Sequence, residues 1–239
     1  MITTQQIQED FTSGLNTFLS NYPDSTLFEP IRYLLSLGGK RIRPILALAV
    51  CNSEGSSSEK AIPASLAVEL FHNFTLMHDD IMDHAPLRRG RETVHEKYSE
   101  NAAILSGDAL FTAAYQAIEK STEKAMPKLL KLINKTSMEV CEGQQLDLDY
   151  ENRVDVTEGM YLEMIRLKTS VLLAASCSMG AICAGADDDR VELWYEFGEK
   201  LGLAFQIQDD YLDTFGLENQ TGKQVGGDIL ADKNTFLLI

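Results

Sequence analysis

The sequence predicts an all-α protein that folds as a single-domain antiparallel bundle of helices. Apolar residues recur at spacings of three and four over long stretches, which is the period of one helix face. Only six prolines occur in 239 residues, so few positions break a helix. The alternating pattern and the Asn-Gly or Asp-Gly turns that indicate hairpins are nearly absent. We therefore expect one domain over residues 1–239.

The expected helices, in chain order, cover residues 3–20, 27–37, 42–53, 60–84, 100–119, 126–149, 155–168, 170–185 and 188–214. Gly38-Gly39 ends the second helix, and Pro44 fits the first turn of the third. Residues 52–58 are small and polar, as is typical of a loop. The apolar ladder of the fourth helix consists of Val68, Phe71, Thr75 and Met82.

Helix-breaking and helix-capping residues in the second half of the chain support the later helices. Residues 86–90 contain Pro and Gly and break the chain after the fourth helix. Residues 170–186 are rich in Ala, Gly, Ser and Cys, which favours a closely packed core helix. Asp187 and its two acidic neighbours can cap the last helix. The sequence stops within an apolar run, residues 236–239, so we expect a fragment or a shortened chain.

Composition limits the partners and the location. The formal net charge is −15, and a nucleic-acid partner is not expected because binding to its backbone needs a basic surface. The four cysteines lack metal-ligand spacing and are expected to be reduced core thiols of a cytoplasmic protein. The first residues lack the pattern of a signal peptide, and no run of about 18 uncharged apolar residues predicts a membrane span.

Two acidic clusters of one pattern, DDxxD, are the main chemical signal. They are Asp79-Asp80-Ile81-Met82-Asp83 and Asp209-Asp210-Tyr211-Leu212-Asp213. In each, the first and last carboxylates are four positions apart and share one helix face, at a cost of about 0.2–0.5 kcal/mol. Apolar flanks make burial expected, and buried carboxylates need a counter-charge. Mg²⁺ suits this role because it prefers carboxylate oxygen and leaves positions for water or phosphate.

Basic residues are scarce, so the places where they cluster are informative. Lys40, Arg41 and Arg43 follow two glycines, and Arg88-Arg89-Gly90-Arg91 comes five residues after the first acidic cluster. Glycine lets backbone N–H groups approach an anion, and arginine binds phosphate bidentately. A solvated or salt-bridged face is the alternative for either cluster alone. Carboxylates, Mg²⁺ and cations together describe a diphosphate site.

Several single residues have an ordinary structural interpretation beside a functional one. His72 lies two helical turns before Asp79, and a hydrogen-bonded core histidine is the default for that position. The other three histidines, His78, His84 and His95, are expected to be structural or exposed. Lys168-Thr169 stands at the junction of two expected helices and could be a surface lysine followed by a cap.

At this point the motifs resemble those of a known family, the trans-isoprenyl diphosphate synthases or polyprenyl synthetase family. The motifs that carry the resemblance are GGKRIRP (38–44), HNFTLMHDDIMDHAPLRRGRETVH (72–95), GQQLDLD (143–149), LKTS (167–170), FQIQDDYLD (205–213) and GK (222–223). They occur in the order typical of the family and cover about residues 30–239.

The resemblance implies a fold, an activity and an assembly. The fold would be all-α around a deep central cavity, usually in a homodimer. The activity would be condensation of isopentenyl diphosphate with an allylic diphosphate (dimethylallyl, geranyl or farnesyl), after Mg²⁺-assisted ionisation of the allylic C–O bond. Such catalysis is electrostatic and positional, and no side-chain nucleophile is required. Family members usually continue beyond Lys233, so this chain is expected to lack the C-terminal helices.

The resemblance also implies roles for individual residues. The Mg²⁺ ligands would be Asp79, Asp83 and Asp209, holding three ions, with Asp80, Asp210 and Asp213 in support. The isopentenyl diphosphate site would consist of Lys40, Arg43, His72 and Arg89. The allylic diphosphate contacts would be Arg88, Lys168, Lys223 and Lys233. The residues beside the allylic carbon would be Thr169 and Gln206.

Product length is expected to depend on the helix that carries the first acidic cluster. Phe74 and Phe71 lie five and eight residues before Asp79 and share a face, so their rings would form a floor under the growing chain. A role as core aromatics is compatible with this. Thr75 is small, and the cluster has no insertion of two residues, which resembles short-chain enzymes with products of fifteen or twenty carbons.

Two other functions are compatible with part of this motif set. A class I terpene cyclase shares the first acidic cluster, but it typically has a different second metal motif and no second diphosphate site. A non-catalytic subunit of a heteromeric synthase tends to lose aspartates, whereas both clusters are intact here. The prenyltransferase is therefore the main prediction.

Overall fold

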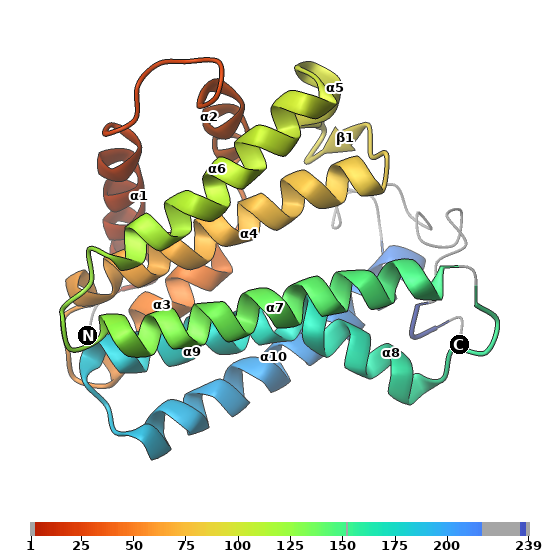
Figure 1. Cartoon of the computed structure of the whole chain (residues 1–239). Helices are drawn as coiled ribbons and strands as arrows, with labels where there is room; N and C mark the ends of the chain where they lie inside the picture. The colour runs from red at the N-terminus through yellow and green to blue at the C-terminus, as the bar shows by residue number, and fades with distance from the viewer. Residues whose placement is uncertain (1–2, 152, 217–234, 238–239) are drawn as a thin grey trace. The chain divides into compact units, whose positions relative to one another are not determined.

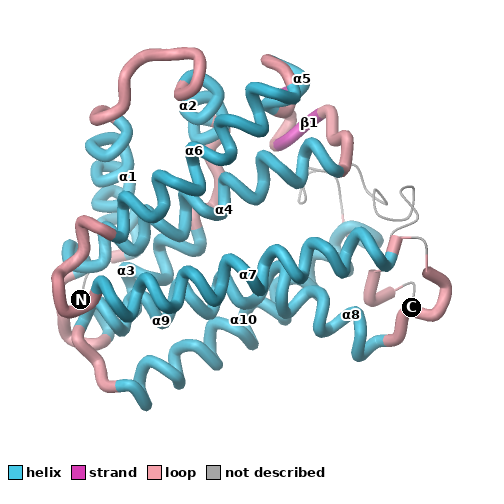
Figure 2. Tube along the Cα trace, viewed as in Figure 1, coloured by secondary structure: helices cyan, strands magenta, loops and turns pink. Residues whose placement is uncertain are grey.

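A computed structural model describes residues 3–151, 153–216 and 235–237 of this chain, which are helical over most of their length (Figures 1 and 2). The chain divides into two compact units. The first unit comprises residues 1–131 and 176–191, and the second comprises residues 132–175 and 192–239. The all-α prediction is confirmed, and the single-domain organisation stays a prediction.

The first unit contains the helices of the N-terminal half. These are α1 (Thr4–Leu19), α2 (Glu29–Ser36), α3 (Ile42–Ser53), the short 3-10 helix η1 (Ser58–Ala61), α4 (Ile62–Met82), α5 (Val94–Lys97) and α6 (Glu100–Ile118). Side-chain oxygens of Thr3, Ser57 and Ser99 accept backbone N–H bonds at the start of α1, η1 and α6. Helices α4 and α6 lie side by side along most of their length (Figure 1).

Helix α4 forms the centre of this unit. Its buried side chains include the apolar Leu70, Phe71 and Met77, which are no more than 1% exposed. The same helix also buries polar groups, namely Glu69, Asn73 and Asp80. Buried charge in an apolar helix requires partners from neighbouring segments, and these partners define the candidate site.

A two-stranded hairpin follows α4 and was not predicted. Strand β1 (Leu87–Arg88) pairs antiparallel with β2 (Arg91–Glu92), with Arg88 opposite Arg91. Arg89 and Gly90 connect the strands with φ of 54° and 74°, the left-handed pair typical of a tight hairpin turn. The sequence indicated only a break at residues 86–90, because strands of two residues show no alternation. The four-residue helix α5 was missed for a similar reason.

The remaining helices are α7 (Met126–Tyr150), α8 (Glu158–Ile165), α9 (Val171–Ala184) and α10 (Asp188–Phe215). Between α8 and α9 the chain forms a π-helical turn, η2 (Arg166–Ser170), where the sequence predicted a break at residues 168–170. The predicted break is wrong, because the chain continues from α8 to α9 through the wider π-helical turn without leaving the helical conformation. Such turns often occur at functional sites. Asp187 accepts a hydrogen bond from the backbone N–H of Arg190 (2.8 Å), which confirms the predicted cap of α10.

Close backbone contact surrounds the π-helical turn in the second unit. A Cβ on Gly143 of α7 would overlap the backbone nitrogen of Lys168. On α10, a Cβ on Gly202 would lie 2.5 Å from the Cα of Ser170. Glycine at these two positions lets α7 and α10 press against η2, which fixes the backbone that carries Lys168.

The hydrophobic core of the second unit lies beside the second acidic cluster. Its buried members are Tyr150, Val156, Tyr161, Met164 and Ile165. Partly buried apolar side chains from α10 and from residues 235–237 pack against them. This core fixes α8 relative to the part of α10 that carries the acidic cluster.

Among the residues that the structure describes, one helical stretch, Glu158–Ala184, has the length and mean hydropathy of a membrane span, and 83% of its most apolar window is buried inside the protein. Length and composition alone are weak evidence of a span, and the burial matches the predicted core helix. Among the cysteines, Cys51, Cys177 and Cys183 are buried as expected, whereas Cys141 is exposed, so the core prediction is wrong for that residue. Burial raises the pKa of Cys177 and Cys183 to about 12, which keeps both thiols protonated.

Two helices of the first unit end in the same hydrogen-bond pattern with different residues. After α4, the N–H of His84 bonds to Ile81 and that of Ala85 to Asp80, and His84 has a left-handed φ of 47°. After α9, Gly185 (φ 87°) and Ala186 repeat these bonds. Glycine is the preferred residue at this position because it has no Cβ to clash.

This difference predicts opposite effects of two substitutions. We expect His84→Gly to raise the free energy of unfolding by about 0.5–1 kcal/mol, because relief of left-handed strain exceeds the added entropy of the unfolded chain. The matched change Gly185→His should lower it by a similar amount. Urea denaturation followed by circular dichroism measures both, and a His84→Gly variant less stable than the parent would contradict the strain argument.

Candidate active site

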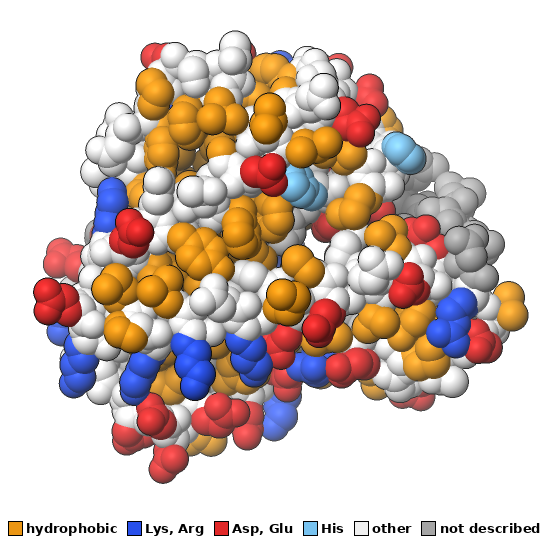
Figure 3. Space-filling model, viewed as in Figure 1, with side chains coloured by type: hydrophobic (Ala, Val, Ile, Leu, Met, Phe, Trp, Pro, Cys, Tyr) orange, Lys and Arg blue, Asp and Glu red, His pale blue; other side chains and the backbone are white. Residues whose placement is uncertain are grey.

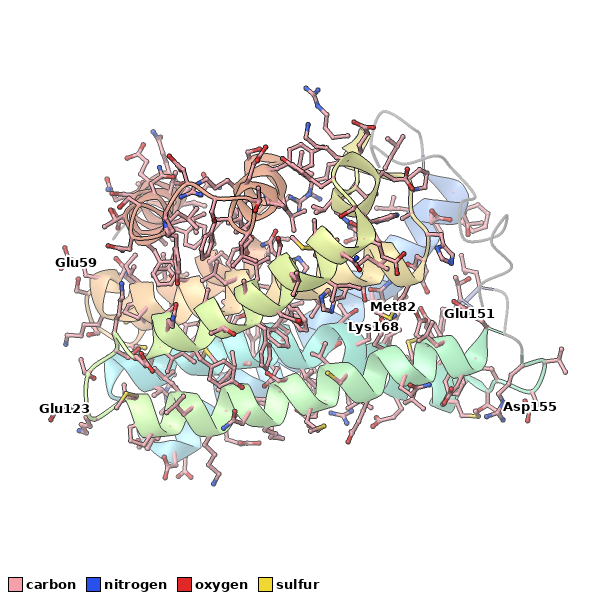
Figure 4. All side chains as sticks on the ribbon, turned by 45° about the horizontal axis from the view of Figure 1, so that its top comes forward. Glu59, Met82, Glu123, Glu151, Asp155 and Lys168 are labelled. Carbon is pink, nitrogen blue, oxygen red and sulfur yellow. The ribbon has the colours of Figure 1, made fainter. Side chains whose placement is uncertain are left out.

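The first acidic cluster occupies the last turns of α4. Asp80 is buried at 2% exposure, whereas Asp79 is partly exposed and Asp83 is exposed. Asp79 lies in the last turn of α4, and Asp83 is the C-cap residue, whose backbone N–H donates to the Asp79 carbonyl at 2.8 Å. Met82, also in this turn, is labelled in Figure 4. The cluster therefore combines one buried carboxylate with two that reach solvent.

The buried carboxylate of Asp80 is held by Arg88 from the hairpin. The Arg88 Nε donates to both carboxylate oxygens (2.9 and 2.8 Å), and its Nη2 donates to Oδ1 at 2.6 Å. Burial alone would lower the pKa of Arg88, but hydrogen bonding and charge pairing with Asp80 raise that pKa above its ordinary value. Burial raises the pKa of Asp80, and the bonds from Arg88 oppose this. We infer a charged, bidentate pair because three hydrogen bonds support it.

The adjacent Arg89 links the hairpin to the loop before α3. Its Nη1 donates to the carbonyl oxygen of Gly38. A Cβ on Gly39 would lie 2.7 Å from the Arg89 guanidinium, so only glycine leaves room for this approach. The structure thus brings together the two basic clusters that the sequence analysis singled out.

Arg43 and His72 form the third contact of this basic region. The Arg43 Nη1 lies 3.3 Å from the His72 Nε2, and because arginine only donates, the histidine nitrogen accepts. Burial lowers the pKa of Arg43 to about 10, against the opposing charge of Glu69. Burial and the positive charge of Arg43 and its neighbours lower the pKa of His72 well below its ordinary value. His72 is therefore neutral near pH 7, and Lys40 is exposed in the same loop.

Sequence reasoning assigned no role to two charged residues of this region, Arg41 and Glu69. Arg41 donates through Nη1 to Glu69 and through Nη2 to the carbonyl of Leu35 (2.6 Å). Asn73 also donates to the Glu69 carboxylate, at 2.9 Å. A signal was available, since Glu69 falls on the apolar face of the expected helix, three residues before His72, where a carboxylate requires a partner.

The aromatic residues expected to limit product length lie together between α4 and α6. Phe74 contacts Phe71 with ring centroids 5.5 Å apart. Phe111 of α6, which the sequence analysis did not single out, completes the group at 5.2 Å from Phe74 and 6.0 Å from Phe71. Thr75 donates its hydroxyl hydrogen to the carbonyl of His72 (2.8 Å). The ring of Tyr115 extends the row along α6.

The second acidic cluster lies on α10 in the second unit and also has a buried middle carboxylate. Its middle residue, Asp210, is 3% exposed, Asp213 is also buried, and Asp209 is partly exposed. Asp210 accepts hydrogen bonds from the Tyr161 hydroxyl, from Gln206 Nε2 (3.1 Å) and from the backbone N–H of Phe236 (3.2 Å). As in the first cluster, protein donors occupy the middle carboxylate.

The π-helical turn carries two further predicted residues of this unit. The Lys168 Nζ donates to Asp147 Oδ2 at 2.6 Å, which gives the GQQLDLD motif a structural role (Lys168 is labelled in Figure 4). The Thr169 hydroxyl donates to Gln206 Oε1 at 3.2 Å. The Gln206 amide thus joins Thr169 to Asp210. The structure brings these predicted residues together, with Tyr161 and Asp147 as contacts that the sequence analysis did not identify.

Other predicted residues lie outside this pattern. Lys223 and Lys233 lie outside the described residues. The His78 Nε2 is 3.2 Å from the Ile104 carbonyl, and His84 is exposed, as expected of structural or surface histidines. The His95 side chain is 11% exposed.

The donor chemistry of the acidic clusters fits Mg²⁺. Within residues 3–151, 153–216 and 235–237, no group of three or more His, Cys, Asp or Glu side chains is arranged to hold a metal ion. Mg²⁺ needs no such group, because it usually takes one or two carboxylates and keeps water or phosphate oxygens as its other ligands. Asp79, Asp83 and Asp209, which are exposed or partly exposed, supply donors of that kind.

Comparisons with known proteins agree with this chemistry. A sequence model described as polyprenyl synthetase matches residues 24–239. Geranylgeranyl diphosphate synthase of Methanosarcina mazei is 44% identical over 215 residues, which are 89% of this chain and 66% of that protein. Short chain isoprenyl diphosphate synthase of Methanocaldococcus jannaschii is 41% identical over 240 residues, which are 100% of this chain and 72% of that protein.

Solved structures give the same result. A crystal structure of geranylgeranyl pyrophosphate synthase has a TM-score of 0.96 and 48% identity, and the match covers 100% of this chain and 73% of that one. Geranylgeranyl pyrophosphate synthetase from Pyrococcus horikoshii has a TM-score of 0.92 and 37% identity, with 98% and 73% covered. The chain spans 66–73% of the length of these four proteins. It belongs to the polyprenyl synthetase family.

Proposed function

We propose that this chain is a trans-prenyltransferase that condenses isopentenyl diphosphate with an allylic diphosphate and releases diphosphate. The observation that carries the proposal is the repeated construction of the acidic clusters. In each, protein donors hold the buried middle aspartate, and the outer aspartates are four residues apart in the chain. The names of the relatives, geranylgeranyl and short-chain isoprenyl diphosphate synthases, support the same activity.

In the first unit, the proposed roles follow from the contacts. Asp79 and Asp83 bind Mg²⁺, and Asp80 supports them by anchoring Arg88, which also contacts the allylic diphosphate. Lys40, Arg43, His72 and Arg89 bind isopentenyl diphosphate. His72 is neutral and accepts a hydrogen bond from Arg43, so it orients the guanidinium without adding charge.

In the second unit, Asp209 is the proposed metal ligand, with Asp210 and Asp213 in support. Lys168 contacts the allylic diphosphate, and Asp147 fixes its ammonium group. The oxygens of Thr169 and Gln206 stabilise the allylic cation, and their mutual hydrogen bond fixes where those oxygens lie. Lys223 and Lys233 are proposed as further diphosphate contacts. Mg²⁺, proposed as three ions, neutralises the leaving diphosphate when bound.

Product length is proposed to be fifteen or twenty carbons. Phe74 sets the limit because it stands next to Phe71 on the helix of the first acidic cluster. Phe111 supports the Phe74 ring from the facing helix. Removal of the Phe74 ring therefore opens space that a longer prenyl chain could occupy.

We further propose a homodimer in the cytoplasm. Helix α6 exposes Ile104 (38%) and Leu105 (60%), and hydrophobic side chains gather on the face that carries α6 (Figure 3). All four cysteines are free, which suits a reducing compartment. Sedimentation velocity of the parent and of Leu105→Glu tests the dimer, since a charge at a self-associating face should yield monomer.

Product analysis tests the activity directly. The chain is incubated with Mg²⁺, isopentenyl diphosphate and, in turn, dimethylallyl, geranyl or farnesyl diphosphate, and the hydrolysed products are separated by chain length. A Mg²⁺-dependent product of fifteen or twenty carbons supports the proposal. Cyclic hydrocarbon from the allylic substrate alone would favour a terpene cyclase, and no product from any primer would contradict the proposal.

The metal roles predict a difference among the aspartates. We expect Asp79→Asn and Asp209→Asn each to lower turnover by about 100-fold or more, and to raise the Mg²⁺ concentration needed for half-maximal activity. The exposed Glu123→Gln is the matched control and should behave like the parent. Steady-state kinetics over a Mg²⁺ series measures both quantities, and an unchanged Mg²⁺ requirement in both aspartate variants would sink the metal assignment.

The aromatic floor predicts a change in product length. We expect Phe74→Ala to shift the main product to one or more additional isoprene units, because the truncated side chain leaves space below the growing chain. Phe197→Ala removes an exposed aromatic ring of α10 and should leave the product length as in the parent. Chromatography of the hydrolysed products measures the chain length. An unchanged product length in Phe74→Ala would refute the proposal that this ring limits chain growth.

The lowered pKa of His72 predicts how stability varies with pH. Its folded-state pKa lies below the ordinary value of 6.5, so below about pH 6.5 the unfolded chain binds more protons than the folded protein. Stability is then lost as pH falls from about 6.5 toward the folded-state pKa. We expect His72→Gln to lose less stability than the parent between about pH 7 and about pH 5. Urea denaturation at each pH gives the comparison, and parallel curves would rule out this contribution.

A further inference from the structure

The turn before α3 holds a conformation that its residues do not favour. Gly38 and Gly39 have φ of 77° and 131°, and Arg41 has a left-handed φ of 49° although it carries a Cβ. Arg41 is also the N-cap of α3, and no side chain caps the helix there. This turn carries Lys40 and leads directly into Arg43. Contacts from outside the turn must therefore hold it in place.

Arg41 provides those contacts through its own side chain. The guanidinium donates to the Leu35 carbonyl at 2.6 Å and to the Glu69 carboxylate of α4. The Arg41 side chain is 16% exposed and that of Glu69 is 3% exposed. A pair this deeply buried depends on both partners, because either charge alone would remain in the interior without compensation.

Glu69 is itself fixed within α4. The Asn73 Nδ2 donates to the Glu69 carboxylate at 2.9 Å and to its backbone carbonyl at 2.8 Å. Asn73 is fully buried, so the carboxylate cannot turn away without leaving that amide unsatisfied. The negative charge also acts on Arg43 and Arg89, whose pKa values it raises against the effect of burial. A single rigid carboxylate thus lies among three of the cations of the basic region.

We propose that Glu69 is a positioning residue for isopentenyl diphosphate: it holds Arg41, and Arg41 in turn fixes the left-handed turn that sets where Lys40 and Arg43 lie. The inference deepens the proposed function and depends on it for the identity of the substrate. Glu69 itself does not touch the anion, because its carboxylate is occupied by Arg41 and Asn73. Its effect reaches the substrate only through the basic turn.

Three variants test this chain of contacts, namely Glu69→Gln, Arg41→Gln and the double variant. Each single change should raise the KM for isopentenyl diphosphate about tenfold, and the double variant should be no worse than either, since both changes remove one interaction. The KM for the allylic diphosphate and kcat should stay within about threefold of the parent. Equal rises in both KM values, or additive effects in the double variant, would overturn the proposal.

A binding measurement separates this inference from the proposed reaction. Inorganic diphosphate is titrated calorimetrically in the presence of EDTA, so that cations of the protein alone bind it. Glu69→Gln should bind about tenfold more weakly than the parent, while Glu59→Gln, a change at an exposed carboxylate of η1, should bind like the parent. If the parent forms no prenyl product, the proposed reaction fails, yet this titration still decides the role of Glu69. Equal affinity of Glu69→Gln and the parent would overturn that role.

The double variant also guards against misfolding. Circular dichroism and thermal unfolding establish whether each variant is folded before its binding is measured. Should Glu69→Gln fail to fold, Arg41→Gln is compared with the double variant, in which neither charge is left without its partner. Equal diphosphate affinity of these two supports the proposal. A further tenfold loss in the double variant would show that Glu69 acts independently of Arg41.

Discussion

The structure of the first unit depends on the pairing of buried charge along α4. This helix fills the core with apolar side chains, yet it also buries Glu69 and Asp80, which would be very costly without partners. Arg41 and Arg88 supply the partners from loops on either side of the helix in sequence. Each arginine must reach α4 to pair with its carboxylate. The same ion pairs that neutralise Glu69 and Asp80 therefore also hold the two basic segments in place. The site is thus organised by the requirements of the core.

The helices of this chain could be predicted closely from the sequence, since long periodic segments with clear punctuation determine them. The end of α3 and the cap at Asp187 follow from local residues alone. The hairpin β1–β2 could not be predicted, because two residues per strand carry no period. The π-helical turn was also missed. Glycines on α7 and α10 lie against this turn, and such a tertiary contact is not recorded in any local sequence pattern.

Some residues of the candidate site could likewise be predicted from the sequence, and others could not. The acidic clusters were evident because like charges on an apolar helix are unusual, and the arginines were evident because basic residues are scarce in this chain. The partners were not evident. Tyr161 lies 49 residues from Asp210, and Asp147 lies 21 residues from Lys168, so only the fold joins them. The sequence reveals charged residues whose burial would be energetically unfavourable. The residues that pair with them cannot be recognised from the sequence, because only the folded structure brings them into contact.

The hairpin after α4 has a consequence for how this region can vary. Arg88 and Arg89 are neighbours in the chain, yet one reaches the carboxylate of Asp80 and the other the carbonyl of Gly38. Arg88 is the last residue of β1, whereas Arg89 is the first residue of the turn and has a left-handed φ of 54°, so the turn geometry directs the two side chains to different partners. Inserting or deleting a single residue here would change the turn type and the register of the two strands, and both contacts would be lost. The length of the hairpin is therefore constrained as strictly as the identity of its two arginines.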